Sequence, residues 1–155
     1  MFNWLKKGIP ELIPIKREED YHTHYIGKTG DGRQFFGYES FVFPDSHHTS
    51  DDWTKSRKEY VVLYIFDNRG NHLETKHWYA GTTAEADDAV SRQKLEEFVS
   101  QLGPVTYTDI IVKPFQVVID GFIFGLVPNK NGKCVELQPG NTISFQEPWD
   151  GEYYT

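Results

Sequence analysis

Residues 58–80 carry the sequence pattern that decides the fold. They read KEYVVLYIF (58–66), DNRGN (67–71) and HLETKHWYA (72–80). The first run is almost entirely β-branched and aromatic, and the last alternates in polarity with a period of two, as a half-exposed strand does. The Asp, Asn and Gly residues between them favour a turn, because Asp and Asn bond their own backbone and Gly accepts positive φ. The stretch therefore predicts a β-hairpin, which we place at the centre of a sheet.

Residues 84–102 are predicted to form one long helix. Thr82 precedes the start of this segment, and Glu85 follows it three residues later. This is the spacing of a capping box. An apolar stripe at helical spacing occupies the later part of the segment and consists of Leu95, Phe98, Val99 and Leu102. The earlier part does not continue this stripe, because Ala86 and Val90 fall on the opposite side.

The remaining strand patterns are short. They cover residues 21–26, 33–43, 105–112, 115–119, 122–127, 133–138 and 142–145. Asp120-Gly121 between two of them favours the type I′ turn of a tight hairpin. Residues 44–56 form the most polar stretch and predict an exposed loop.

These patterns together predict an α+β fold. Strands joined by hairpin-length turns stand on both sides of a single helical segment, so we expect a mainly antiparallel β-sheet built from hairpins. One long α-helix would pack on one face of this sheet and leave the other face to solvent. A chain of 155 residues suits a single domain, residues 1–155, with an extended N-terminal arm (1–15) and a C-terminal tail (146–155).

The charge and composition of the chain disfavour several classes of protein. The formal net charge of −7 disfavours a protein that binds nucleic acid or an anionic membrane, since such proteins need clustered Lys and Arg. No apolar run approaches the roughly 18 residues of a membrane span, and no hydrophobic segment follows the N-terminal lysines as in a secretory signal. A cytoplasmic location is therefore expected. Cys134 is the single cysteine, which excludes an internal disulfide.

Histidines suggest one alternative function. His22 and His24 would share one face of a strand, and His47 and His48 lie in the polar loop, where residues 45–52 also include three aspartates. Three such ligands would satisfy zinc, so a small metal-binding protein or metal-dependent hydrolase stays open. His-x-His is common on exposed strands, however, and adjacent loop histidines cannot easily both bind one ion. We therefore assign no metal ligand and no catalytic residue, and we expect no cofactor.

Aromatic residues in polar surroundings point instead to protein binding. Trp53 lies in the polar loop beside Asp51 and Asp52, and Trp78 lies on the charged side of its strand. Tryptophan is a common anchor of protein interfaces. The sequence thus favours a non-enzymatic domain that binds another protein, as a regulator or as an immunity-type inhibitor of a toxin, through Trp53, Asp51, Asp52 and Trp78.

Several motifs carry a resemblance to a known family. They are YIG (25–27), GDGRQFFG (30–37), FD (66–67), GNHL (70–73), WYAGTT (78–83), IDG (119–121), FGL (124–126) and PWDG (148–151). In these motifs the chain resembles a family of small uncharacterised bacterial proteins, some of which carry the label "formate hydrogenlyase regulatory protein". The likeness extends over most of the chain from about residue 14. It implies a regulatory, non-enzymatic protein of the bacterial cytoplasm.

Overall fold

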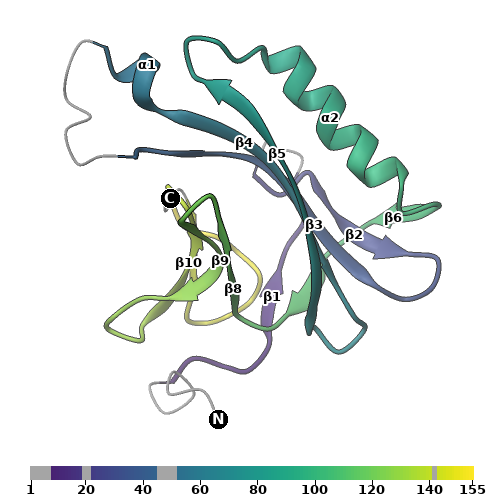
Figure 1. Ribbon diagram of the computed structural model, residues 1–155. Helices are drawn as coiled ribbons and strands as arrows, with labels where there is room; N and C mark the ends of the chain where they lie inside the picture. The colour runs from purple at the N-terminus through teal and green to yellow at the C-terminus, as the bar shows by residue number, and fades with distance from the viewer. Residues whose placement is uncertain (1–7, 19–21, 45–51, 141–142) are drawn as a thin grey trace.

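The computed structural model describes residues 8–18, 22–44, 52–140 and 143–155. Within these ranges the chain forms an α+β structure in which strands pair antiparallel (Figure 1). In chain order the elements are β1 (Ile13–Ile15), β2 (Tyr25–Thr29), β3 (Gln34–Val42), α1 (Trp53–Ser56), β4 (Lys58–Phe66), β5 (His72–Thr82), α2 (Asp88–Ser100), β6 (Val105–Tyr107), β7 (Ile110–Val112), β8 (Phe115–Ile119), β9 (Phe122–Pro128), β10 (Cys134–Gln138) and β11 (Ser144–Gln146).

The larger sheet has five strands in the order β5-β4-β3-β2-β6. The hairpin predicted for residues 58–80 is confirmed, because β4 pairs with β5 along its whole length. Asp67 shapes the turn, since its carboxylate accepts hydrogen bonds from the backbone N–H groups of Arg69 and Asn71, each at 2.9 Å. The predicted position at the centre of the sheet is wrong. β5 is an edge strand, because β4 is its only neighbour in the sheet.

The prediction of one long helix over residues 84–102 is also wrong. The described residues contain two short helices, α1 with 4 residues and α2 with 13. Thr82 and Glu85 do interact, as Glu85 Oε1 accepts hydrogen bonds from Thr82 N at 3.1 Å and Thr82 Oγ1 at 2.8 Å. These bonds belong to a turn that precedes the helix. The N-cap is Asp87, whose carboxylate accepts a hydrogen bond from Ala89 N at 2.9 Å.

Helix α2 covers one face of the larger sheet (Figure 1). Its apolar stripe meets the side chains of β3 and β4 that point toward that face. This helix-side core consists of the buried residues Phe35, Val61, Leu63, Ile65, Leu95, Phe98, Val99 and Leu102. Gly37 lies beneath Leu95, where an added Cβ would come within 2.8 Å of Leu95 Cδ1. The absence of a side chain at this position lets the helix approach the sheet closely.

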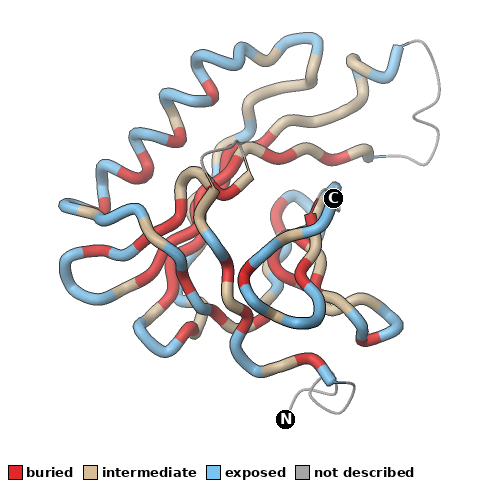
Figure 2. The backbone as a smooth tube through the Cα atoms, turned by 180° about the vertical axis from the view of Figure 1, so that it is seen from behind, coloured by how far each residue is buried: buried red, intermediate tan, exposed pale blue. Residues whose placement is uncertain are grey.

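The opposite face of the larger sheet is buried as well, so the expectation that it faces solvent is wrong. A second sheet, with the order β11-β10-β9-β8, packs against it (Figure 1). Residues 60–66 of β4 are all buried (Figure 2). Their side chains belong alternately to the core between the two sheets and to the helix-side core. A continuous apolar run is typical of a strand covered on both faces. The inter-sheet core includes Ile26, Phe36, Tyr60, Tyr64, Phe66, Phe124, Leu126, Val135, Leu137 and Phe145.

The second predicted hairpin, β8 to β9, is confirmed. Ile119 pairs with Phe122 across the two turn residues Asp120 and Gly121, whose φ angles of 53° and 86° suit a type I′ turn. The turn also joins the two sheets, because Tyr60 Oη donates a hydrogen bond to Asp120 Oδ2 at 2.8 Å.

The segment predicted as one strand over residues 105–112 forms two strands in different sheets. β6 pairs with β2 of the larger sheet, whereas β7 pairs with β1 near the N-terminus. Ile13 and Ile15 of β1 are fully buried, so this part of the predicted arm contributes to the inter-sheet core. The side chain of Gln34 in β3 links β7 to the larger sheet, because its Oε1 accepts a hydrogen bond from Ile111 N at 2.8 Å.

Two further predictions need correction. The strand predicted for residues 21–26 begins only at Tyr25 and extends to Thr29. The end of the predicted loop 44–56 forms helix α1, while residues 45–51 lie outside the described part of the chain. Neither helix in the described ranges has the length and apolar character required to cross a membrane.

Candidate functional site

Trp53 lies at the start of helix α1, where the chain returns from the loop between β3 and β4. Its side chain is 37% exposed, and its ring centroid lies 6.4 Å from that of Phe43. Asp52 precedes it as an exposed residue, with Oδ1 3.9 Å from Lys55 Nζ. The sequence-predicted Asp51 lies outside the described residues.

Arg57 fixes the position of Trp53. The guanidinium carbon of Arg57 lies 4.3 Å from the ring centroid of Phe41, 4.9 Å from Trp53 and 5.9 Å from Phe43. Such contacts between a cation and aromatic faces are attractive, and more so when water is partly excluded. We call Phe41, Phe43, Trp53 and Arg57 the arginine–aromatic cluster.

Polar partners hold the guanidinium of Arg57 in this orientation. Arg57 Nε donates a hydrogen bond to Thr83 Oγ1 at 2.8 Å, and Arg57 Nη2 donates one to Glu59 Oε1 at 2.8 Å. Thr83 Oγ1 in turn donates to Glu59 Oε1 at 2.7 Å. The side chains of this ion pair are 23% and 21% exposed, so the charges are largely shielded from solvent. The network orients the guanidinium against which the ring of Trp53 packs.

A polar pocket of about 370 Å³ adjoins the cluster. Its lining includes Glu39 of β3, Arg57 just before β4, and Asp88, Ser91 and Arg92 of the first half of α2. Arg92 donates from Nε at 3.1 Å and from Nη2 at 3.0 Å to Glu39 Oε2. The bonds to Glu39 raise the pKa of Arg92, which therefore remains charged.

The pocket exists because the helix is apolar on its inner side only in its second half. One turn before Leu95, the inward positions are occupied by Ser91 and Arg92 in place of apolar residues. Ser91 is buried, whereas Val90 is 47% exposed. The mismatch between the two halves of the stripe, visible in the sequence, was thus the signal of this pocket.

Trp78 occupies different surroundings from Trp53. It lies on β5 opposite Val61 and is half-buried against the helix-side core. Lys94 Nζ lies 5.9 Å from its ring centroid. Trp53 and Trp78 therefore pack against different neighbours, one at the arginine–aromatic cluster and the other beneath α2.

The histidines predicted to share a strand face lie in a turn before β2. The ring of His22 packs 5.3 Å from that of Tyr153, and the ring of His24 packs 4.6 Å from that of Tyr25. Arg17 Nε donates a hydrogen bond to the carbonyl oxygen of His24 at 3.0 Å. Across the described ranges no three His, Cys, Asp or Glu residues form a group that could hold a metal ion. His47 and His48 fall outside those ranges.

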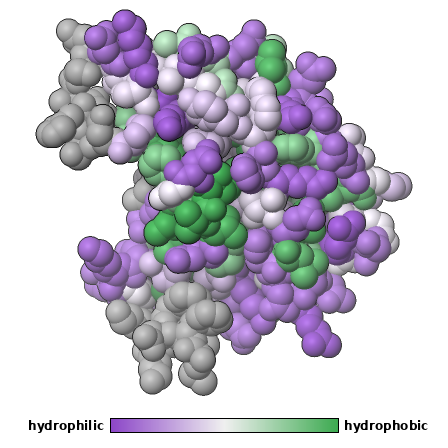
Figure 3. Space-filling model, viewed as in Figure 1, coloured by the Kyte–Doolittle hydropathy of each residue, from purple (hydrophilic) through white to green (hydrophobic). Residues whose placement is uncertain are grey.

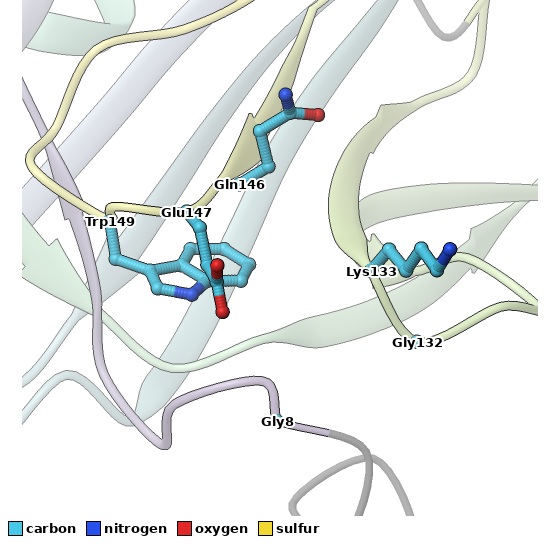
Figure 4. Close-up of a pocket in the computed structure, with 6 residues that line it drawn as sticks. All are labelled: Gly8, Gly132, Lys133, Gln146, Glu147 and Trp149. Carbon is cyan, nitrogen blue, oxygen red and sulfur yellow. The ribbon is translucent and has the colours of Figure 1, made fainter.

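A second pocket, also of about 370 Å³, lies beside the C-terminal tail (Figure 4). Glu147 and Trp149 line one side of it, and Lys133 comes from the turn before β10. Trp149 also packs against the inter-sheet core, so its indole covers the edge of that core. Gly8 also forms part of the wall of this pocket.

The chain was compared with known proteins in three ways. Neither models of protein families, nor curated protein sequences, nor solved structures gave a match to this chain.

Proposed function

We propose that this protein is a non-catalytic domain that binds another protein through a surface centred on Trp53 and Arg57. The observation that carries the proposal is the arginine–aromatic cluster, in which a part-exposed indole is held against a guanidinium. Trp and Arg are enriched among the few residues that supply most of the binding energy at protein interfaces. A side chain already fixed in place loses little entropy on binding, which strengthens association.

Charge favours a basic partner. The chain carries a formal net charge of −7, and exposed Asp52 stands next to Trp53 at the rim of the surface. Opposite charge steers two proteins together and raises the rate of association. The sequence also suggests Trp78 and Asp51 for this surface, and their part in it stays a prediction, because Trp78 packs beneath α2 and Asp51 lies outside the described residues.

The polar pocket beside the cluster supports a binding role. Both of its arginines are tied to glutamates, Arg57 to Glu59 and Arg92 to Glu39. These ion pairs set the shape and charge of the pocket wall. Acid–base catalysis requires, in contrast, a group whose pKa lies near the working pH. A regulator or an immunity-type inhibitor, acting by occupying its partner, would need only this surface. The metal-dependent alternative, which uses His22, His24 and the loop of residues 45–52, stays a prediction.

Affinity capture from the source organism tests the proposal. Tagged full-length protein, the variant Trp53→Ala and the control Val90→Ala would be compared by quantitative mass spectrometry, and any enriched protein would be purified for calorimetry. We expect a basic partner whose affinity falls by about 30-fold or more in Trp53→Ala, the size of a hot-spot effect, and is unchanged in Val90→Ala. Binding should also weaken as salt is raised. Equal binding by the three proteins, or no enriched protein, would contradict the proposal.

A further inference from the structure

The two main sheets have four edge strands, β5 and β6 in the larger sheet and β8 and β11 in the smaller one. An edge strand exposes a row of unpaired N–H and C=O groups, which can pair with another chain. Natural proteins protect such edges with bulges, charges, short strands or a covering segment. An edge strand that lacks all of these features is open to pairing with another chain.

Three of the edges are protected. β5 has register irregularities against β4 at two places and carries the charged residues Glu74 and Lys76. β6 and β11 have only three residues each. β11 is also covered by the tail, because Ser144 and Tyr154 exchange backbone hydrogen bonds at 2.9 and 2.8 Å.

Strand β8 has none of these protections. Its five residues, FQVVI, include no charge and no proline, and its register with β9 is regular. Ile119 and Phe122 close a two-residue hairpin and form a hydrogen-bonded pair, so the N–H and C=O groups of Gln116 and Val118 point away from β9. In the part of the chain that the structure describes, no hydrogen bond reaches these groups.

The side chains next to this edge form an apolar patch. Val118 is 68% exposed, more than any other large hydrophobic residue within the described ranges, and its cross-strand neighbour Ile123 is 48% exposed. Figure 3 shows a hydrophobic patch at the place of the β8–β9 hairpin in the view of Figure 1. An exposed patch with an open backbone edge marks an interaction surface.

We infer that two copies of this chain associate through β8, which pairs antiparallel with β8 of the second copy. The charges at the two ends of β8, Lys113 and Asp120, favour a second copy of the chain as the partner. With Val117 on the two-fold axis, Phe115 pairs with Ile119 of the partner, and Lys113 of one copy lies beside Asp120 of the other. The same surface is then complementary to itself, as a two-fold interface requires. Lys113 also contacts Glu11 at 3.3 Å and Asp120 accepts the bond from Tyr60, so both charges are held near the ends of the strand.

Sedimentation equilibrium of the full-length protein tests the inference. We expect a monomer–dimer equilibrium that Val118→Lys shifts toward monomer, because a lysine on an edge strand opposes pairing. Val118→Pro removes only the outward N–H, so it should also give monomer and keep the circular dichroism spectrum of the wild type. The control Val90→Lys, a similarly exposed valine on α2, should dimerise like the wild type.

A wild type that stays monomeric at all concentrations, or a dimer that persists in both Val118 variants, overturns the inference. Trp53→Ala should leave the dimer intact, so that loss of the partner interaction and loss of self-association are distinguished.

Discussion

The imidazole of His72 lies flat on the ring of Phe115, with ring centroids 4.6 Å apart and an angle of 8° between the planes. This stack joins β5 of the larger sheet to β8 of the smaller one. His72 Nε2 also lies within hydrogen-bond distance of Thr75 Oγ1, at 2.7 Å. Burial lowers the pKa of His72 below its ordinary value of 6.5, so folding favours the neutral ring over the charged one.

The first prediction concerns the pH dependence of stability. Below pH 6.5 the unfolded chain binds a proton at His72 more readily than the folded chain does, so the free energy of unfolding falls as the pH drops from that value. His72→Phe keeps an aromatic ring on Phe115 and removes the titrating group. Urea denaturation between pH 7.5 and pH 5.5, roughly one unit on each side of the ordinary value, should show a smaller loss of stability in this variant. The exposed His77→Phe is the matched control and should behave as the wild type.

The second prediction compares the two halves of helix α2. Leu95 is 1% exposed in the helix-side core, so Leu95→Ala should reduce the free energy of unfolding by about 2–5 kcal/mol. Arg92 and Glu39 form an ion pair whose side chains are 46% and 31% exposed, and solvent screens such pairs. Arg92→Ala should therefore cost less than about 1 kcal/mol. Chemical denaturation measures both, and similar losses would show that the polar half of the helix is as important for packing as the apolar half.

The third prediction concerns the place where β2 meets β6. A Cβ added at Gly27 would lie 2.1 Å from the carbonyl oxygen of Thr106, whereas at Gly30 the nearest such atom is the carbonyl oxygen of Pro104 at 3.9 Å. Gly27→Ala should lower the free energy of unfolding by about 2 kcal/mol or more, because backbone must move. Gly30→Ala should be neutral or slightly stabilising, by up to about 1 kcal/mol, since it reduces the freedom of the unfolded chain. Thermal unfolding that ranks the two variants equally would exclude this steric explanation.

The fourth prediction separates the predicted helix cap from the observed one. Asp87→Ala removes the carboxylate that accepts from the first N–H groups of α2, and should cost about 1 kcal/mol. Thr82→Ala removes a contact of the preceding turn and should cost less than about 0.5 kcal/mol. Helical circular dichroism during urea denaturation reports both changes. A larger effect from Thr82 would favour a helix that begins earlier than Asp88.

Local patterns in the sequence predicted the parts of the fold that depend on neighbouring residues. The hairpins at residues 58–80 and 115–127 follow from period-two alternation and from turn residues between the strands. The partner of each sheet face does not follow from such patterns, because it depends on contacts between distant segments. The continuous apolar run of residues 60–66 is typical of burial on both faces, but this signal was overlooked when one face was predicted to be left to solvent.

The candidate site was predicted in part. Trp53 stood out in the sequence as a large ring among polar residues, and the structure places it at the surface. Arg57 was missed, because the rings around it come from two segments, the end of β3 and the start of α1. The alternation of Phe41 and Phe43 before the loop, with Arg57 just after it, was a usable signal. In a hairpin these positions come together on one face.

The pairing of β1 with β7 sets an order on how the chain can mature. Ile13 pairs with Val112, so about a hundred residues must leave the ribosome before the first strand meets its neighbour. Bringing together ends so far apart carries an entropic cost that short hairpins avoid. Until then Ile13 and Ile15 lack their partner strand, so this end of the chain is completed late during synthesis.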